Sequence, residues 1–116
     1  MKRPRKALQR SERKQWLFVI PSRLGYSVRT TPGYWRLITT VKHPTLAGKE
    51  RAVIRTLTTP DEIRRSKVDA SVFMFYRKLN GKYLCVVTKR LAGKAGFIMT
   101  AYVTEKIKEG QTVWKK

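Results

Sequence analysis

The order of apolar and polar positions divides the chain into a first part with strand and helix signals and a second part with strand signals only. Trp16–Ile20 and Tyr26–Thr30 are short runs rich in β-branched and aromatic residues. Pro21-Ser22 stops the first run and Gly25 precedes the second, so the two runs predict a hairpin.

After residue 30 the apolar period becomes helical. Thr31-Pro32 is typical of an N-cap followed by proline at the first helical position. Apolar side chains then recur at the spacing i, i+3, i+4, i+7, which predicts one apolar stripe. The stripe consists of Tyr34, Leu37, Ile38 and Val41. Pro44 ends this helix and disfavours helical dihedrals at His43, the residue before it.

Two more helices are expected before the strands of the second part. Leu46–Leu57 places its apolar residues on one side. Thr59-Pro60-Asp61-Glu62 repeats the cap, proline and acidic first turn that open a helix, and predicts a short one ending near Ser66.

The second part predicts an antiparallel meander. Ser71–Arg77 and Tyr83–Arg90 are strand-like and flank Asn80-Gly81, the strongest two-residue hairpin signal. A looser turn leads to a third strand, Phe97–Thr104. Glu105–Glu109 is expected to form a closing turn, with Trp114 buried in a docking tail. The sequence therefore predicts an α+β domain in which helices pack on one face of a mainly antiparallel sheet.

Composition adds a strongly basic character. The 116 residues include 27 Lys and Arg against 7 Asp and Glu, a formal charge of +20. Charge repulsion of this size destabilises a compact chain and is typical of proteins whose partner is a polyanion. Residues 1–14 hold seven basic side chains and one large apolar residue, so they predict a basic flexible arm, with one domain over residues 15–116. A frayed first helix is the alternative for the arm.

Several classes of protein are excluded at this stage. The longest apolar runs have five residues, so no membrane span is expected, and the basic N-terminus lacks the apolar segment of a secretory signal. Cys85 is the single cysteine and His43 the single histidine, and the seven acids do not cluster. We therefore expect no disulfide, metal or cofactor, and a cytoplasmic location.

The basic residues predict a nucleic-acid surface. Short clusters occur around residues 64–67, 77–78 and 89–94. Tyrosines and tryptophans lie between them in the sequence, and exposed aromatics stack on bases in nucleic-acid modules. The candidate contact residues are Lys42, Arg64, Arg65, Ser66, Lys67, Arg90 and Lys94, and the candidate stacking residues include Tyr26, Tyr34, Trp35, Tyr76, Tyr83 and Tyr102.

His43 is the candidate for chemistry, because histidine titrates closest to neutral pH. The surrounding positive charge favours the neutral imidazole that a general base requires. RNA supplies its own nucleophile, the 2′-OH, so a metal-free ribonuclease needs a base, cations for the phosphorane and a proton for the 5′-oxygen. Hydrolysis of DNA needs an activated water, commonly metal-bound. The residues therefore favour RNA as the substrate of an enzyme.

Five segments together resemble a phage-associated nuclease family of the barnase–EndoU–colicin–RelE (BECR) superfamily. They are Lys42-His43-Pro44, Pro60–Ser66, Phe75-Tyr76-Arg77, Val86–Lys89 and Ile98–Tyr102. The resemblance covers about residues 33–114 and implies a RelE-like fold and a small metal-independent ribonuclease, typically a toxin. It implies that His43, Arg77, Lys89 and Thr100 surround one cleft, with Arg64 and Ser66 near the RNA backbone.

The predicted hairpin restricts that set. If Asn80-Gly81 is a two-residue turn, Arg77 pairs with Leu84 and lies on one face, whereas Tyr76 and Lys89 lie on the other. We therefore expect Arg77 and Thr100 to act with His43, and Lys89 or Tyr76 to take the remaining role.

The sequence thus favours a ribonuclease toxin whose partners are RNA, the ribosome and an acidic antitoxin or immunity protein. A non-catalytic RNA- or ribosome-binding protein fits the charge and size equally well. A DNA-binding or phage structural protein is the third class.

Overall fold

A computed structural model describes residues 16–116, and the predicted arm, residues 1–14, lies outside the described residues. Seven strands in this part form one sheet in the order β1-β2-β6-β5-β4-β3-β7. The strands are β1 Phe18–Pro21, β2 Ser27–Thr30, β3 Glu62–Arg65, β4 Val72–Leu79, β5 Lys82–Arg90, β6 Ala95–Thr104 and β7 Gln111–Lys115. The helical elements are α2 Pro32–Leu37, a π-helical turn Ile38–Lys42, a 3₁₀ turn Pro44–Leu46 and α3 Glu50–Thr58.

The domain is α+β, and its sheet is mixed. All neighbouring strands are antiparallel except β2 and β6, which run parallel. The β4–β5 hairpin has the predicted turn, with Asn80 at φ 51° and Gly81 at φ 80°. Its register is also as predicted, because Arg77 pairs with Leu84 and Tyr76 with Cys85.

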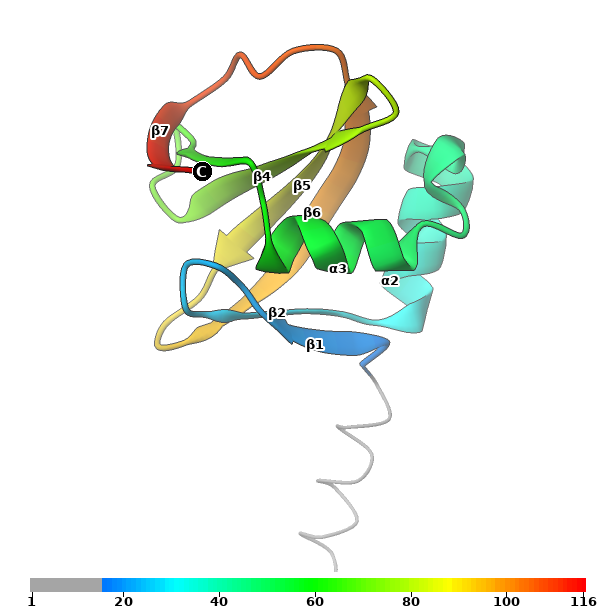
Figure 1. Cartoon of the computed structure of the whole chain (residues 1–116). Coiled ribbons are helices and arrows are strands. Elements are labelled where there is room, and N and C mark those ends of the chain that lie inside the picture. Colours follow the sequence, from blue (N-terminus) through cyan, green and yellow to red (C-terminus); the bar gives the residue numbers. More distant parts are fainter. Residues whose placement is uncertain (1–15) are drawn as a thin grey trace, which may run out of the picture.

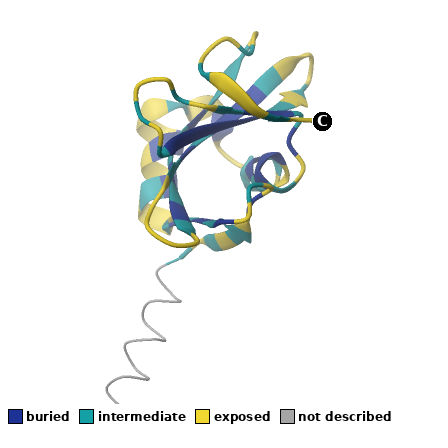
Figure 2. Cartoon of the chain, turned by 90° about the vertical axis from the view of Figure 1, so that its left-hand side faces the viewer, coloured by how far each residue is buried: buried dark blue, intermediate teal, exposed yellow. Residues whose placement is uncertain are grey.

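The main core lies between the helices and one face of the sheet, which we call the inner face. Trp35, Ile38, Val53 and Leu57 from the helical segments pack there. The sheet contributes Val28, Ile63, Phe73, Phe75, Leu84, Val86, Ile98 and Ala101, and Tyr26 joins them from the position before β2. Figure 1 shows α3 lying across the central strands, and in Figure 2 the buried residues gather on the strands and on α3, whereas the loops are exposed.

The predicted short helix over residues 59–66 is wrong. Residues 62–65 form β3, which pairs with β4 on one side and β7 on the other. The signal was misleading because Thr59 closes α3 instead of opening a new helix: its hydroxyl and its N–H both donate to the carbonyl of Arg55. Ile63 is then fully buried in the core, and this burial favours the strand.

Two other predictions hold only in part. Thr31 caps α2 as expected, since its hydroxyl accepts the N–H of Tyr34 at 3.0 Å. The apolar stripe is wrong at two of its four positions, because Leu37 and Val41 are exposed, and the buried residues are Trp35, Ile38 and Thr39. Trp114 is half-buried against the main core and lies under the Arg23 guanidinium at 5.1 Å.

Candidate active site on the outer face of the sheet

The π-helical turn positions His43. Its N–H donates to the carbonyl of Ile38 at 2.6 Å, five residues back, and its dihedrals (φ −143°, ψ 79°) take the chain out of the helix before Pro44. Such single π turns are frequent at functional sites. The imidazole then lies against the ring of Tyr102 on β6, with ring centroids 5.7 Å apart and a tilt of 39°. The half-buried His43 is therefore next to the sheet face that the helices do not cover, which we call the outer face.

A bulge in β6 aligns the other polar residues on that face. Val87 pairs with Thr100 while its neighbour Thr88 pairs with Ile98, so Met99 is the extra residue. The hydroxyl of Tyr34 donates to the Met99 carbonyl at 2.5 Å and so joins α2 to the bulge. Beyond the bulge, successive side chains of β6 point to opposite faces of the sheet, and Thr100 and Tyr102 both lie on the outer face. The Thr100 hydroxyl is buried and has no hydrogen-bond partner among residues 16–116.

The centre of the outer face is a small cluster of buried side chains. Met74, Tyr76 and Cys85 form it, with Tyr102 packed against it. Burial raises the pKa of the Cys85 thiol to about 12. Burial, together with the neighbouring thiol, also raises the pKa of Tyr76 and of Tyr102 well above the ordinary phenol value. Both phenols therefore keep their protons at neutral pH and act as hydrogen-bond donors.

Two lysines of the loop after β6 line the same cavity as the phenols of Tyr76 and Tyr102. Lys106 and Lys108, with Glu109 and Thr104, line a cavity of about 160 Å³ whose wall includes Tyr76 and Tyr102. Ile107, between the two lysines, packs against the outer-face cluster and holds this loop on the sheet. The cavity therefore combines two phenols and two exposed ammonium groups, which suit a phosphate, with one carboxylate, that of Glu109.

The structure does not bring Arg77 to this site. Arg77 lies on the inner face, where its Nη1 donates to the Thr59 carbonyl at 2.6 Å and to the Thr59 hydroxyl at 3.2 Å. It lines a separate pocket with Arg51 and Arg55 of α3. The expected cleft shared by His43, Thr100 and Arg77 is therefore not formed, because β4 and β5 pair without a bulge and Arg77 stays on the face opposite Thr100.

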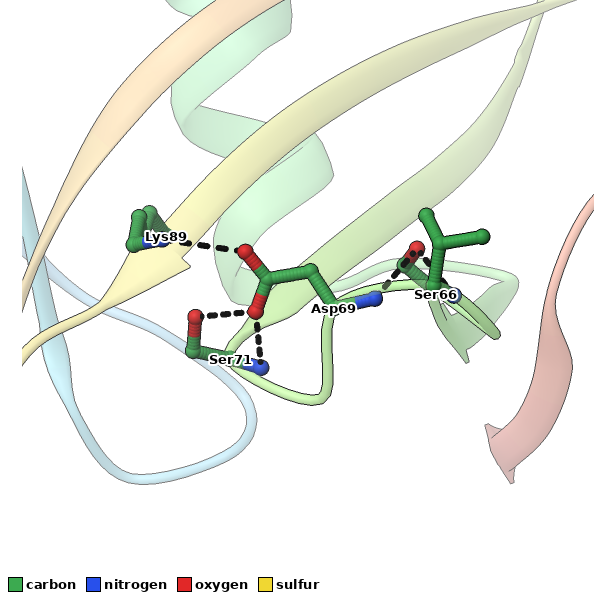
Figure 3. A network of polar contacts seen from close by, with 5 residues as sticks. Ser66, Asp69, Ser71 and Lys89 are labelled. Carbon is green, nitrogen blue, oxygen red and sulfur yellow. Dashed lines mark hydrogen bonds and ion pairs between the residues drawn. The ribbon is translucent and has the colours of Figure 1, made fainter.

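Lys89 shares the outer face but is already paired. Its Nζ lies 3.0 Å from one carboxylate oxygen of Asp69. The other oxygen of Asp69 accepts hydrogen bonds from the hydroxyl and the N–H of Ser71 (Figure 3). The hydrogen bonds from Ser71 and Lys89 lower the pKa of Asp69 to about 2. Lys89 is four positions from Cys85 along β5, or about 13 Å at the rise of a strand. Lys89 is thus distant from the His43–Tyr102 pair.

The predicted nucleic-acid contacts fall into two groups. Four of them are engaged within the protein. Lys42 donates to the Tyr34 hydroxyl, Arg64 pairs with Glu62 at 2.7 Å, Ser66 accepts the N–H groups of Val68 and Asp69, and Arg90 lies 5.4 Å from the ring of Tyr26. The other three are exposed, namely Arg65, Lys67 and Lys94.

Sequence reasoning did not assign Tyr102, Lys106 or Lys108 a part in catalysis. A signal for Tyr102 was present, because it follows Thr100 at the i+2 spacing that places both on one face of a strand. The sequence held no such signal for Lys106 and Lys108, because they follow the predicted strands in a segment that was expected to form a closing turn.

Within residues 16–116, no group of three or more His, Cys, Asp or Glu side chains is arranged to hold a metal ion. No helix of this part is long and apolar enough to cross a membrane. Comparisons with protein-family models, with curated proteins and with solved structures find no match.

Proposed function

We propose that the protein is a metal-independent endoribonuclease that cleaves RNA at the outer face of its sheet. The observation that carries the proposal is the contact between His43 and Tyr102 on the face that also presents Thr100. A base and a proton donor are thus in contact, and Tyr102 also lines the cavity that Lys106 and Lys108 border. The BECR-like fold implied by the sequence resemblance is part of this proposal.

In the proposed reaction, the neutral imidazole of His43 takes the proton of the 2′-OH. The 2′-oxygen forms a bond to phosphorus while the bond from phosphorus to the 5′-oxygen breaks. The protonated phenol of Tyr102 gives its proton to the departing 5′-oxygen, and the products carry a 2′,3′-cyclic phosphate and a 5′-OH. Lys106 and Lys108 stabilise the charge that develops on the phosphorane oxygens.

This assignment revises the roles expected from the sequence. His43 keeps its part, whereas Thr100 lies on the same face but has a buried hydroxyl. Tyr102 takes the proton-donating role for which Lys89 and Tyr76 competed, because it contacts His43, whereas the Tyr76 hydroxyl points to the sulfur of Met74 at 3.9 Å. The cationic role passes from Arg77 to the lysines of the 106–108 loop.

The biological setting that we propose is that of a toxin acting on cytoplasmic RNA, on or off the ribosome. Its excess of positive charge favours an acidic antitoxin or immunity protein that covers the outer face. Expression of the chain should then arrest growth, and an acidic partner should relieve the arrest.

The second candidate is a non-catalytic RNA-binding protein. The observation that favours it is the pair of half-buried rings, Tyr83 and Tyr102, on the face that carries Lys106 and Lys108, because base stacking on rings next to cations gives affinity without chemistry. Incubation of the purified protein with total RNA in the presence of EDTA separates the two. Fragments ending in 2′,3′-cyclic phosphate support the ribonuclease, and intact RNA that co-purifies with the protein supports the alternative.

A further inference from the structure

A second cavity lies at the junction of β2, α2 and β6, away from the His43–Tyr102 contact. Its volume is about 350 Å³, within the range of small-molecule sites. Three aromatic rings line it, those of Trp16, Tyr34 and Phe97. Between them lie Arg29 and Thr30 of β2.

One polar group that lines this cavity lacks a partner. The Arg29 guanidinium lies over the ring of Trp16 at 5.3 Å, but its Nε is buried without a hydrogen bond among residues 16–116. The hydroxyl of Thr30 is also buried without a partner, but Thr30 alternates with Arg29 along β2 and lies on the inner side with Val28. A buried polar group without a partner costs stability, so the unpaired Arg29 Nε at this cavity calls for an explanation.

The lining selects one class of ligand. A purely apolar ligand would leave the Arg29 N–H unpaired, and a bare anion would make no use of the three rings. An unpaired nucleobase satisfies both features, because its faces stack on aromatic and guanidinium planes while its edge carries hydrogen-bond donors and acceptors. We propose that this cavity binds one base of a single-stranded RNA, and we call it the base pocket.

The base pocket is connected to the proposed cleavage site along β6. Phe97 pairs with Lys89, and Tyr102 pairs with Cys85, so both lie on the outer face. The two positions are about 15 Å apart at the rise of a strand. A strand of RNA that extends over β6 can therefore place a base in the pocket while a nearby phosphate lies at His43. This inference rests on the proposal that the substrate is RNA.

The test uses the full chain and two uncleavable probes of equal charge. One is a 2′-deoxy oligonucleotide of abasic residues with a single central 2-aminopurine, and the other is entirely abasic. We expect the wild-type protein to bind the 2-aminopurine probe about tenfold more tightly, the effect of stacking one base. We also expect the fluorescence of the bound base to be quenched. Equal affinity for the two probes would overturn the inference.

Substitutions test whether the preference for the 2-aminopurine probe arises from the base pocket. Phe97→Leu removes a ring and Arg29→Gln removes the unpaired donor, and each should reduce the preference below about threefold. Thermal unfolding checks that all variants fold. Arg36→Gln, on the exposed part of α2, is the charge-matched control and should weaken both probes equally. A tenfold preference that survives in Phe97→Leu and Arg29→Gln would contradict the assignment.

The result is separable from that of the cleavage experiment, because neither probe has a 2′-OH. If RNA is not cleaved but the base preference follows the variants, the base pocket stands and the protein is an RNA-binding protein. If RNA is cleaved and the two probes bind equally, the base pocket is wrong and the ribonuclease stands.

Discussion

The imidazole of His43 lies 5.7 Å from the ring of Tyr102, which joins the end of the helical segment to the last long strand of the meander. The contact depends on two local irregularities. The π-helical turn before His43 directs the chain out of the helix, and the bulge at Met99 sets the alternation of β6. Tyr34 connects them through its hydrogen bond to the bulge carbonyl. His43 therefore lies at the outer face of the sheet, although the helical segment that precedes it packs on the inner face.

Tyr102→Phe should separate chemistry from binding. The variant keeps the ring that contacts His43 and removes only the proposed proton donor. We expect the cleavage rate to fall about 100-fold and RNA affinity to change less than about twofold, measured by single-turnover cleavage and by fluorescence anisotropy. Tyr83→Phe, a half-buried tyrosine packed against the same cluster, is the control and should cleave at the wild-type rate. An unchanged rate for Tyr102→Phe would place the proton donor elsewhere.

Arg77→Ala should affect the fold more than the reaction. The guanidinium holds the end of α3 through the Thr59 carbonyl, and loss of a charged hydrogen bond at a half-exposed site costs about 1 kcal/mol. We expect a lower urea midpoint and a cleavage rate within about threefold of the wild type once the protein is folded. Arg55→Ala, on the exposed side of α3, serves as a control for the loss of one charge. A 100-fold loss of rate with unchanged stability would restore Arg77 to the site.

Substitution of two glycines by alanine should change the free energy of unfolding in opposite directions. A Cβ at Gly96 would lie 2.9 Å from the Lys89 carbonyl oxygen and 2.9 Å from the Tyr26 ring. Overpacking of this kind costs about 1–3 kcal/mol. A Cβ at Gly33 in α2 meets nothing within 4 Å, and alanine there should stabilise the helix by about 0.5–1 kcal/mol. Urea unfolding of Gly96→Ala and Gly33→Ala measures both, and a stable Gly96→Ala protein would contradict the packing of β6 on Tyr26.

The Asp69 network should make stability depend on acid pH. The pKa of Asp69 is about 2 in the folded protein and 3.8 is its ordinary value. The stabilisation is therefore complete above about pH 4 and is lost as the pH falls toward 2. The difference in urea midpoint between the wild type and Asp69→Asn should shrink over that interval. Glu105→Gln, an exposed acid in the loop after β6, is the control, and a difference that stays constant from pH 5 to pH 2 would contradict the network.

Local signals determined the parts of the fold that the sequence predicted well. Asn80-Gly81 sets the register of β4 and β5 through its backbone dihedrals, and Thr31-Pro32 starts α2 through one hydrogen bond. β3 was misread because its local signals were those of a helix start. It becomes a strand through pairing with β4 and β7, which are distant in the sequence.

In the candidate site, too, local signals predicted some features, whereas others depend on irregularities or contacts that the sequence does not indicate. The register argument correctly separated Arg77 from Lys89, because strand alternation follows from the turn alone. Thr100 required the bulge at Met99, and the position of His43 required the π-helical turn, neither of which has a pattern of its own in the sequence. The lysines at 106 and 108 join the site only because Ile107 packs on the outer face.

The most direct test of the ribonuclease proposal is the single-turnover cleavage rate of a defined single-stranded RNA, with EDTA present, by the wild-type protein and by His43→Ala. The imidazole is one group beside 27 lysines and arginines, so the variant should bind the RNA with nearly the wild-type affinity. The proposal predicts cyclic-phosphate products from the wild type and a rate at least about 100-fold lower from His43→Ala. Cleavage at the wild-type rate by His43→Ala, or no cleavage by the wild-type protein, would contradict it.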